Sequence, residues 1–358
     1  MTAAIGLRRL GVAVDLVEVD PQWRVYGAGI TISSSTQRAF AQLGVVDQIL
    51  ARGFCADGID VYDRAGNYLL ELPTARLAGP HIPSQGAIMR PVLRELMSEA
   101  TLAAGVAVHL GVTFESIEQD GRQVHVEFTD GRAQSYDLVI GADGLRSKVR
   151  QYLFPGGPQP SFTGQGCWRA VVPRPSEVSR VRFFMGIEDK AGVNPVSKDE
   201  MYLFLNASER PHQQMDEARL PQLLAERLRG YGGVVADIRD GLNAASRVLY
   251  RPLEKLLLPA PWYRDRVLLI GDAVHSTTPH LASGAGIAVE DGLVIADELA
   301  RSGDVAQALE RFMARRYERC RMVVENSVRL GDIEQHGGSQ NEHAQLMRDS
   351  IAALAAPI

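Results

Sequence analysis

An acidic residue and two glycines follow a short apolar run late in the chain. Residues 267–270 are apolar and bounded by a charge and a glycine, which is typical of a parallel strand buried on both faces. Asp272 comes at the carboxyl end of this strand, where open α/β sheets bind ligands. Gly284 and Gly286 lack a Cβ and precede a helix predicted over about 287–299, whose N-terminus offers free N–H groups. The segment therefore predicts a site for a flat cofactor.

A second segment repeats this order earlier in the chain. Residues 136–140 form an apolar strand, and Gly141-Ala-Asp143-Gly leads into a short helix that carries Ser147 and Arg150. A strand, turn and helix with incidental glycines is the plain alternative for either segment, so each alone is moderately specific. Both in this order, about 130 residues apart, are a strong signal.

Together the two segments resemble the Asp-Gly and Gly-Asp motifs of the p-hydroxybenzoate hydroxylase-like family, which are single-component FAD-dependent aromatic hydroxylases. The resemblance extends from Thr2 to about Arg329. It implies an α/β fold in which a Rossmann-like FAD-binding domain is interleaved with a mostly antiparallel β-sheet substrate domain. The implied segments are 1–55, 86–160 and 248–335 for FAD, 56–85 and 161–247 for the substrate, and a C-terminal tail over 336–358.

The first residues depart from the family pattern. Members open with a strand and a GxGxxG turn, whereas this sequence begins inside the following helix and continues into the second strand, 12–17. Because a doubly wound sheet without its middle strand has unpaired backbone groups, we interpret Met1 as an internal or misassigned start. The alternative is a truncated, non-catalytic remnant that no longer holds FAD.

The resemblance also implies which residues bind FAD. Glu18 stands where the family's acid binds the adenosine ribose, and Gly29 lies in a turn that passes the pyrophosphate. Arg90 reaches the cofactor in the family, although a surface loop at Gly29 and a surface ion pair at Arg90 are plain alternatives. The full set is Glu18, Val19, Gly29, Arg90, Val112, Asp143, Arg150, Asp272, Gly284, Ala285, Gly286 and Ile287. NADH or NADPH is the expected transient hydride donor, and the choice between them stays open.

The reaction implied by the resemblance begins with hydride transfer from the nicotinamide to FAD. Dioxygen then adds at the flavin C4a, and the hydroperoxide transfers one oxygen to a small aromatic or N-heteroaromatic compound. The candidate catalytic residues are Pro279 beside the isoalloxazine, His280 as the base for a phenol, and Arg169 as the partner of a carboxylate or phenolate. Trp168, Asn194 and Pro195 are further substrate candidates, although a lone Arg or His is more often structural.

Other functions stay open at this point. A flavoprotein epoxidase or reductase on the same fold, or a flavin-free scaffold protein, shares much of the pattern. The Trp-x-Trp-x-Ile-Pro run that is typical of flavin halogenases is missing from the sequence.

Composition and charge narrow the class further. The chain has 358 residues, 46% hydrophobic and 23% charged, which is enough for two domains. A net charge of -5 without a basic run gives no support for nucleic-acid binding. Three scattered cysteines without a CxxC pair fit a reducing cytoplasm and predict no metal site. No apolar run reaches membrane-spanning length, so we expect a cytoplasmic monomer or homodimer whose partners are O2 and its aromatic substrate.

Hydrophobic periodicity predicts the elements that position these residues. Helices are predicted over about 33–51, 91–104, 215–228 and 305–329. Strands are predicted in a hairpin over 59–72, in a meander over 116–140, and over 166–172, 181–187 and 200–206, with Asn194 and Pro195 in a loop. Arg315, Arg316, Arg319 and Arg321 are interpreted as one solvated helix face.

Overall fold

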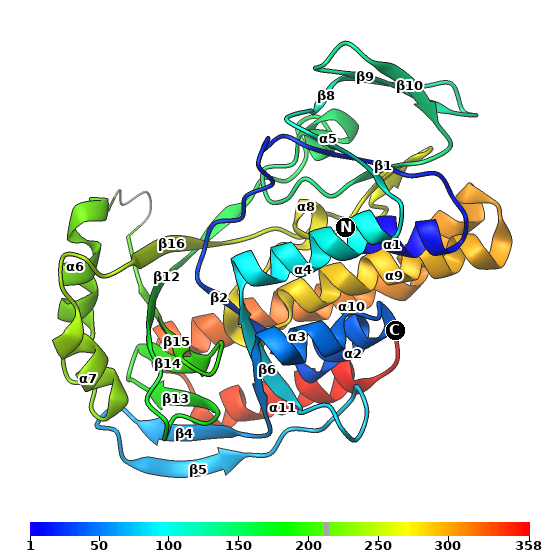
Figure 1. Ribbon diagram of the computed structural model, residues 1–358. Coiled ribbons are helices and arrows are strands. Elements are labelled where there is room, and N and C mark those ends of the chain that lie inside the picture. The colour runs from blue at the N-terminus through cyan, green and yellow to red at the C-terminus, as the bar shows by residue number, and fades with distance from the viewer. Residues whose placement is uncertain (211–214) are drawn as a thin grey trace.

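The computed structural model describes residues 1–210 and 215–358. Figure 1 shows long helices across the middle of the molecule, with β-structure on both sides of them. The largest sheet lies beside α6 (Leu220–Arg227) and α7 (Val234–Gly241), and the meander of β8 (Phe114–Gln119), β9 (Val124–Phe128) and β10 (Ala133–Tyr136) lies at the far end. Among the described residues, no helix combines the length and the apolar character that a bilayer crossing requires.

The largest sheet has seven strands in the order β16, β12, β15, β14, β13, β4, β5. Their bounds are β16 (Val248–Lys255), β12 (Ser161–Pro173), β15 (Glu200–Ser208), β14 (Asp189–Pro195), β13 (Val181–Met185), β4 (Ile59–Asp63) and β5 (Tyr68–Leu72). All neighbours are antiparallel except β13 and β4. One face packs against α6 and α7 through an apolar core that includes Trp168, Leu203 and Leu224. The mostly antiparallel sheet of the predicted fold class is thus confirmed.

Two separate parallel ladders carry the segments that predict the cofactor site. β1 (Asp15–Glu18) pairs with β7 (Ala107–Leu110), and β11 (Val139–Gly141) pairs with β18 (Val267–Leu269). The short β17 (Tyr263–Arg264) runs antiparallel to β18. Within the described residues, no strand connects β1 to β11 through hydrogen bonds. The carboxyl ends of β11 and β18 therefore lie together, while β1 belongs to its own ladder.

The helical layer lies between these ladders and the large sheet. It contains α1 (Thr2–Arg9), α4 (Arg90–Ala103), α9 (Gly284–Ser302) and α10 (Val305–Gln335). A three-stranded antiparallel sheet of β2 (Gly29–Ser33), β6 (Gln85–Met89) and β3 (Phe54–Ala56) connects this layer to the large sheet. The short elements α5 (Lys148–Leu153), α8 (Asp272–His275), η1 (Glu217–Arg219) and η2 (Pro279–Leu281) complete the described fold.

The helix predicted over 33–51 is wrong, because two helices occupy this range. α2 (Ser34–Gln42) ends before Gly44, and α3 (Val46–Arg52) begins after it. Gly44 has a φ of +74°, which a residue without Cβ adopts at no steric cost. Its N–H donates to the Ala41 carbonyl and the Val45 N–H donates to that of Phe40, which is a Schellman ending.

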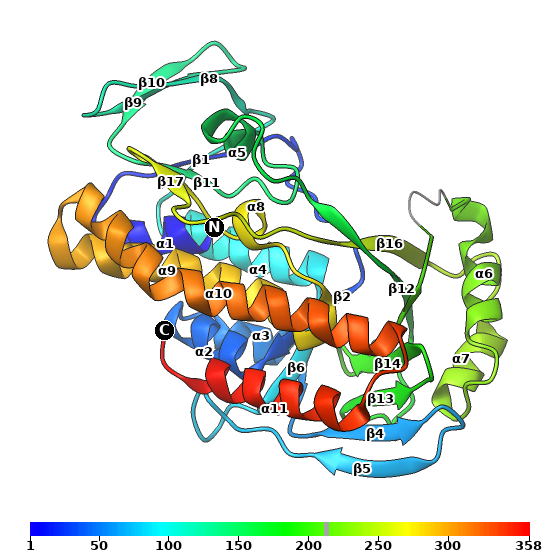
Figure 2. The same cartoon turned by 180° about the vertical axis from the view of Figure 1, so that it is seen from behind.

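The tail predicted over 336–358 is also wrong. Residues 340–355 form α11 (Gln340–Ala355), which runs beside α10 as seen from behind in Figure 2. Arg319 donates to the carbonyl of Leu354 at 3.0 Å, and Arg38 donates to that of Ala355 at 2.7 Å. These guanidinium groups satisfy carbonyls at the helix end that have no partner within the helix. The last residues are therefore a part of the fold.

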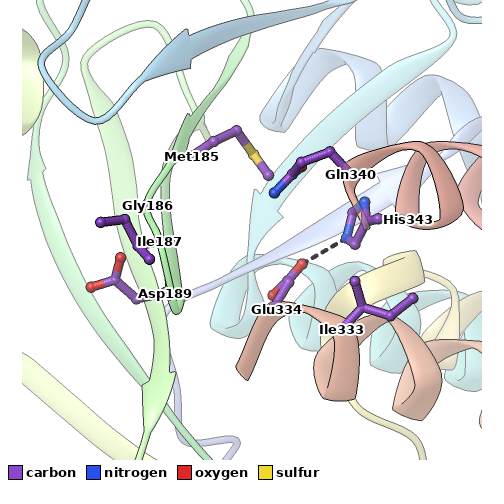
Figure 3. Close-up of a pocket in the computed structure, with 8 residues that line it drawn as sticks. All are labelled: Met185, Gly186, Ile187, Asp189, Ile333, Glu334, Gln340 and His343. Atoms are coloured by element: carbon purple, nitrogen blue, oxygen red, sulfur yellow. Dashed lines mark hydrogen bonds and ion pairs between the residues drawn. The ribbon is translucent and has the colours of Figure 1, made fainter. Parts of the chain in front are cut away.

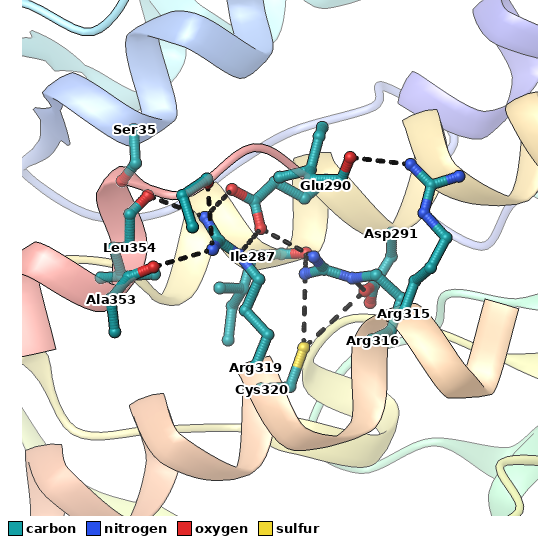
Figure 4. A network of polar contacts seen from close by, with 12 residues as sticks. Ser35, Ile287, Glu290, Asp291, Arg315, Arg316, Arg319, Cys320, Ala353 and Leu354 are labelled. Carbon is teal, nitrogen blue, oxygen red and sulfur yellow. Dashed lines mark hydrogen bonds and ion pairs between the residues drawn. The ribbon is translucent and has the colours of Figure 1, made fainter.

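The solvated arginine face predicted on α10 is wrong for Arg316. Its side chain is fully buried, and it donates to Asp291 Oδ1 at 2.8 Å and Glu290 Oε2 at 2.8 Å (Figure 4). Arg319 also binds Glu290, whereas the side chain of Arg321 is 41% exposed. The arginine pattern thus has a buried side, which holds α9 and α10 together.

Candidate active site

The two predicted Asp turns lie next to each other. β11 and β18 are parallel neighbours, with Ile140 opposite Leu268, and the Ile270 N–H donates to the Gly141 carbonyl at 3.0 Å. Both turns therefore emerge from the same edge of the ladder, where ligands bind in open α/β sheets. The sequence places these turns about 130 residues apart, and the fold brings them together.

Asp272 offers a free carboxylate at this edge. Its side chain is accessible to solvent and has no hydrogen-bond partner in residues 1–210 and 215–358. Burial nevertheless raises the pKa of Asp272 above its usual value, while His275 and Arg90 oppose the shift. An accessible carboxylate that is closely surrounded by protein is suited to accept hydrogen bonds from the hydroxyls of a bound ligand.

The N-terminus of α9 offers free N–H groups beside this carboxylate. The helix begins at Gly284 and not at Ile287, so the unpaired donors belong to Gly284, Ala285 and Gly286. Ser283 precedes the helix but its hydroxyl donates to the Leu281 carbonyl, so no side chain caps these donors. A long uncapped helix provides partial positive charge as well as donors for an anionic edge of a ligand.

Gly286 has a packing reason in addition. A Cβ at this position would lie 2.3 Å from Thr36 Oγ1 of α2, which real side chains do not tolerate. The missing side chain therefore lets α9 pass directly over α2. The sequence does not reveal this contact, because there the glycine is interpreted as space for the ligand.

Asp143 and Arg150 stabilise the second turn from within. The Asp143 carboxylate accepts from Ser147 Oγ at 2.5 Å and from the Lys148 N–H at 2.6 Å, so it caps α5. The guanidinium of Arg150 donates to the carbonyls of Leu145 and Ala273, each at 2.9 Å. Arg150 therefore connects the two Asp turns through their backbones, and direct contact of either side chain with FAD stays a prediction.

Two guanidinium groups lie near one another at the site, and the first of them, Arg90, faces Asp272. Arg90 begins α4, and Arg169 lies on β12. Burial and the positive charge of Arg169 both lower the pKa of Arg90, while Asp272 opposes them. Neither arginine has a carboxylate within 4.0 Å among the described residues. Arg90 and Arg169 together carry two positive charges, and Asp272 carries one negative charge. The net positive charge of these three groups favours an anionic ligand.

One face of β12 runs from Arg169 toward η2, which follows the Asp272 turn (the cofactor turn). Side chains alternate along a strand, so Gln165, Cys167 and Arg169 share one face. Gln165 is fully buried, both of its side-chain polar atoms lack a partner among the described residues, and a Cβ on Gly331 of α10 would meet both Gln165 and His280 within 3 Å. The five residues from Gln165 to Arg169 span about 13 Å along the strand.

Trp168 points the other way, so its assignment to the substrate is wrong. Its indole Nε1–H donates to Glu209 Oε1 at 2.9 Å, and the guanidinium of Arg227 lies 4.5 Å from the ring. The side chain is fully buried against α6 and α7. Because successive residues of a strand face opposite sides, Arg169 on the site side requires Trp168 on the core side.

Asn194 and Pro195 lie in β14 and not in the predicted loop. Both are buried, and Asn194 Nδ2 donates to Thr31 Oγ1 of β2 at 3.0 Å. Thr31 also shares a hydrogen bond with the Tyr202 hydroxyl at 2.8 Å, and a Cβ on Gly29 would lie 2.3 Å from the Tyr202 ring. Gly29 is therefore required for the close approach of β2 to the large sheet, and Asn194 joins the two sheets.

Glu18, Val19 and Val112 lie together at the end of β1. Glu18 Oε1 accepts from the Asp20 N–H at 2.9 Å, and the Val112 N–H donates to the Glu18 carbonyl at 3.1 Å. Val19 is 65% exposed. One oxygen of Glu18 remains available for a ribose hydroxyl, as the resemblance implies.

Pro279 and His280 belong to η2, next to the cofactor turn. His280 Nδ1 shares a hydrogen bond with Thr278 Oγ1 at 2.9 Å, and Nε2 lies 3.2 Å from Glu334 Oε2. Burial lowers the pKa of His280, although the Glu334 carboxylate opposes the shift. A neutral buried imidazole is a suitable proton acceptor near neutral pH.

His275, the other histidine of this turn, has a structural partner. Its Nε2 lies 2.6 Å from Asp291 Oδ2, and the same oxygen accepts from the Gly271 N–H at 2.9 Å. Cys320 lies close to both, but Arg316 contacts Asp291 and Cys320 as well. Because a guanidinium already neutralises this group, we interpret it as the support of the turn and not as a metal site.

The residues present fit FAD on three observations of the structure. These are the free Asp272 carboxylate, the uncapped N-terminus of α9 and the positive pair Arg90 and Arg169. A family model described as FAD binding domain matches residues 1–327. The chain belongs to this family, the p-hydroxybenzoate hydroxylase-like FAD-dependent monooxygenases. The resemblance given by the Asp143 and Asp272 motifs is thereby confirmed.

Relatives of this monooxygenase match over most of their length. The 2-heptyl-3-hydroxy-4(1H)-quinolone synthase of Pseudomonas aeruginosa is 32% identical over 326 residues, covering 89% of this chain and 83% of that protein. The 6-hydroxynicotinate 3-monooxygenase of Bordetella bronchiseptica is 28% identical, covering 88% and 85%. The crystal structure of Klebsiella pneumoniae HpxO complexed with FAD and uric acid has a TM-score of 0.85, with 24% identity over 99% of this chain and 94% of that chain. The last comparison shows the fold.

Three residues of the site were missed in the sequence. Gln165 falls outside the strand that is predicted from residue 166, and Lys190 lies in β14, which the sequence does not predict as a strand. Glu334 falls beyond the predicted end of the last long helix at 329. A helical period continued to residue 335 was the available signal for Glu334, since Leu330, Ile333 and Glu334 lie on one face.

Proposed function

We propose that this monooxygenase hydroxylates a small aromatic or N-heteroaromatic compound that carries a negative charge and an ionisable hydroxyl, with NADH or NADPH as the electron donor. The observation that supports the proposal best is the pair Arg90 and Arg169, which has no carboxylate within 4.0 Å among the described residues, and of which Arg90 faces Asp272 of the predicted flavin turn. FAD, when bound, supplies the oxygen chemistry that side chains lack.

Different residues of the chain bind the cofactor and the aromatic substrate. Asp272 and the N–H groups of Gly284 to Gly286 hold the cofactor. Arg169 orients the substrate, because a guanidinium fork matches a planar carboxylate or phenolate. His280 takes the proton of the substrate hydroxyl, which raises the electron density of the ring. Pro279 shapes the wall beside the flavin, and burial of η2 excludes water there.

The substrate class agrees with the relatives. One of them is named for 6-hydroxynicotinate, and HpxO was crystallised with uric acid. Both compounds are planar N-heteroaromatics with ionisable groups. We extend this chemistry to our chain because the face of β12 that carries Arg169 also carries Gln165, and a Cβ on Gly331 would lie 2.8 Å from Gln165 and 2.9 Å from His280 of η2.

The test begins with purified protein titrated with FAD, followed by flavin fluorescence. NADH and NADPH oxidation are then measured across a panel of aromatic acids and their matched carboxamides, with labelled dioxygen and mass spectrometry of the products. We expect one labelled oxygen in a ring that bears a carboxylate or phenolate, and a large stimulation of oxidation by that compound. Arg169→Met should raise KM for the acid by roughly 10- to 100-fold and leave KM for the carboxamide nearly unchanged.

The opposite results are equally clear. If an alkene or a lipid with a reducible double bond is turned over while no ring gains oxygen, the epoxidase or reductase function replaces the hydroxylase. If the acid and the carboxamide respond equally to Arg169→Met, Arg169 does not bind the substrate anion. Cytoplasmic location and a monomeric or homodimeric state remain parts of the proposal, and size-exclusion chromatography tests the latter.

A further inference from the structure

A compact ionic cluster lies where the cofactor turn meets the large sheet and the last two helices. Glu334 of α10 is at its centre. Its Oε1 accepts from Lys190 Nζ of β14 at 2.5 Å and lies 3.0 Å from His343 Nε2 of α11. Its Oε2 lies 3.2 Å from His280 Nε2 of η2, at ion-pair distance without the alignment of a hydrogen bond. One carboxylate thus faces three basic side chains from three other elements.

The cluster is almost closed to solvent. The side chain of His280 is fully buried, those of Lys190 and Glu334 are each 5% exposed, and that of His343 is 12% exposed. Figure 3 shows Glu334 and His343 at a small pocket between the turn after β13 and the ends of α10 and α11. Charges in such a place are screened far less than charges on the surface.

Glu334 carries a negative charge in this setting. Burial by itself would raise the pKa of the carboxyl, but Lys190 and His280 hold it well below its usual value. The charged groups that face His280 are Glu334, Lys190 and His343. The first favours a positive charge on the imidazole, and the other two disfavour it.

We propose that Glu334 is a positioning residue for His280, which fixes the imidazole tautomer and stabilises the imidazolium that forms during the reaction. This inference rests on the proposed function, in which His280 is the base. A carboxylate beside Nε2 keeps a proton on that nitrogen, so Nδ1 carries no proton and accepts the hydrogen bond of the Thr278 hydroxyl.

The proton transfer then balances without another reactant. The O–H bond of the substrate breaks as its proton passes to Thr278 Oγ1, the Thr278 hydroxyl proton passes to Nδ1 and forms an N–H bond there, and the electron pair stays on the substrate oxygen. The Nε2 proton remains on the ring and faces the Glu334 carboxylate, which compensates the new positive charge. Lys190 has the opposite effect to Glu334 on the pKa of His280. It donates a hydrogen bond to Oε1 of the same carboxylate, and its positive charge disfavours a positive charge on the imidazole.

Glu334 and Lys190 shift the pKa of His280 in opposite directions, and this difference can be tested on the full chain without ligand. The pKa of His280 is measured by NMR with carbon-labelled histidine, and its resonance is assigned by its loss in His280→Gln. Glu334→Gln should lower this pKa by roughly 1 to 3 units, because an opposite charge within 4 Å is removed. Lys190→Met should raise it, because a like charge is removed. His343→Gln should also raise it, at pH values where His343 is protonated.

Glu209→Gln serves as the matched control. Glu209 is a carboxylate of similar burial, 2% exposed, which pairs with Arg227 on the other face of β12. Its loss should reduce the free energy of unfolding and leave the pKa of His280 unchanged. If Glu334→Gln does not fold, Lys190→Met and His343→Gln carry the test through the pH profile of the reaction, which a purely structural cluster would leave in place.

The second readout is the pH profile of kcat/KM with 6-hydroxynicotinate or with the best aromatic acid of the panel. We expect the acidic limb to move to lower pH in Glu334→Gln and to higher pH in Lys190→Met. If His280→Gln leaves this limb in place, His280 is not the base, which overturns its proposed function and the role of Glu334 together. If His280→Gln removes the limb but both cluster variants leave it and the pKa of His280 unmoved, only the positioning role is wrong.

Discussion

Replacement of Arg316 by methionine tests the most consequential difference between sequence and structure. The guanidinium is fully buried and donates four hydrogen bonds, to Asp291 Oδ1, Glu290 Oε2, the Ile287 carbonyl and Cys320 Sγ, at 2.8, 2.8, 2.9 and 3.3 Å (Figure 4). Methionine has a similar length and no charge, so Arg316→Met removes the charge with little loss of packing.

The expected loss of stability depends on which hydrogen-bond partners Glu290 and Asp291 keep in the variant. Glu290 keeps Arg319, which donates to both of its oxygens at 2.8 Å. Asp291 keeps His275 and the Gly271 N–H on Oδ2, but its Oδ1 has no other cation. Loss of one partner of a buried ion pair costs about 3–5 kcal/mol. Since proteins have about 5–15 kcal/mol of stability in total, the variant should lose a large fraction of it.

The assay is urea unfolding followed by far-UV circular dichroism, with FAD affinity measured in parallel. Arg321→Met is the control, because this side chain is 41% exposed and pairs with Glu318 and Glu325 on the surface of the same helix. An exposed pair contributes about 0–1 kcal/mol, so this control should change little. FAD affinity should fall in Arg316→Met, because Asp291 also binds the Gly271 N–H of the cofactor turn. If both variants lose equally little free energy of unfolding, the reasoning is refuted and Arg316 behaves like a solvated residue of the helix surface.

Three further predictions concern the cofactor turn. Asp272→Ala should weaken FAD binding by roughly 10- to 100-fold, from about 1.5–3 kcal/mol for a charge-assisted hydrogen bond; an unchanged dissociation constant by flavin fluorescence would reject the assignment. Gly286→Ala should lose about 1–3 kcal/mol by overpacking against Thr36, and Thr36→Ala in the same chain should restore most of it in thermal unfolding. For His275, burial alone would lower the pKa, but Cys320 and Asp291 raise it well above its usual value. Its stabilisation is therefore complete below about pH 6.5 and is lost as the pH rises through the folded pKa, so His275→Gln should flatten that alkaline decline of stability.

The sequence was sufficient for the parts of the site that are local in the chain. The Asp272 turn, the glycines before α9 and the Asp143 turn are each defined within a few residues, because a short strand, a turn and a helix start depend on neighbouring residues. Helix α4 after Pro91 and the Asp-Gly turns of the meander were predicted for the same reason. These motifs also carried the family.

The sequence was less informative where a residue's role depends on which face of a strand it occupies, or on which strands pair with its own. Trp168 and Arg169 are equally plausible as site residues in the sequence, and only the register of β12 in the sheet sends one to the core and the other to the site. β14 was missed because Gly192, Asn194 and Pro195 look like a loop, yet pairing with β13 and β15 makes it a central strand. Tertiary pairing overrides local propensity in such strands.

What the sequence determined by itself is the fold class, the two Asp turns and the family, because these depend on patterns that are local and repeat in a fixed order. Only the tertiary structure decided how charges are shared. Arg316 looks like a surface residue until α9 covers it, and Glu334 reaches His280 only because α10 continues to residue 335 and packs beside η2. A charge becomes costly, and therefore informative, only when surrounding chain excludes water from it, and burial is a property of the assembled fold.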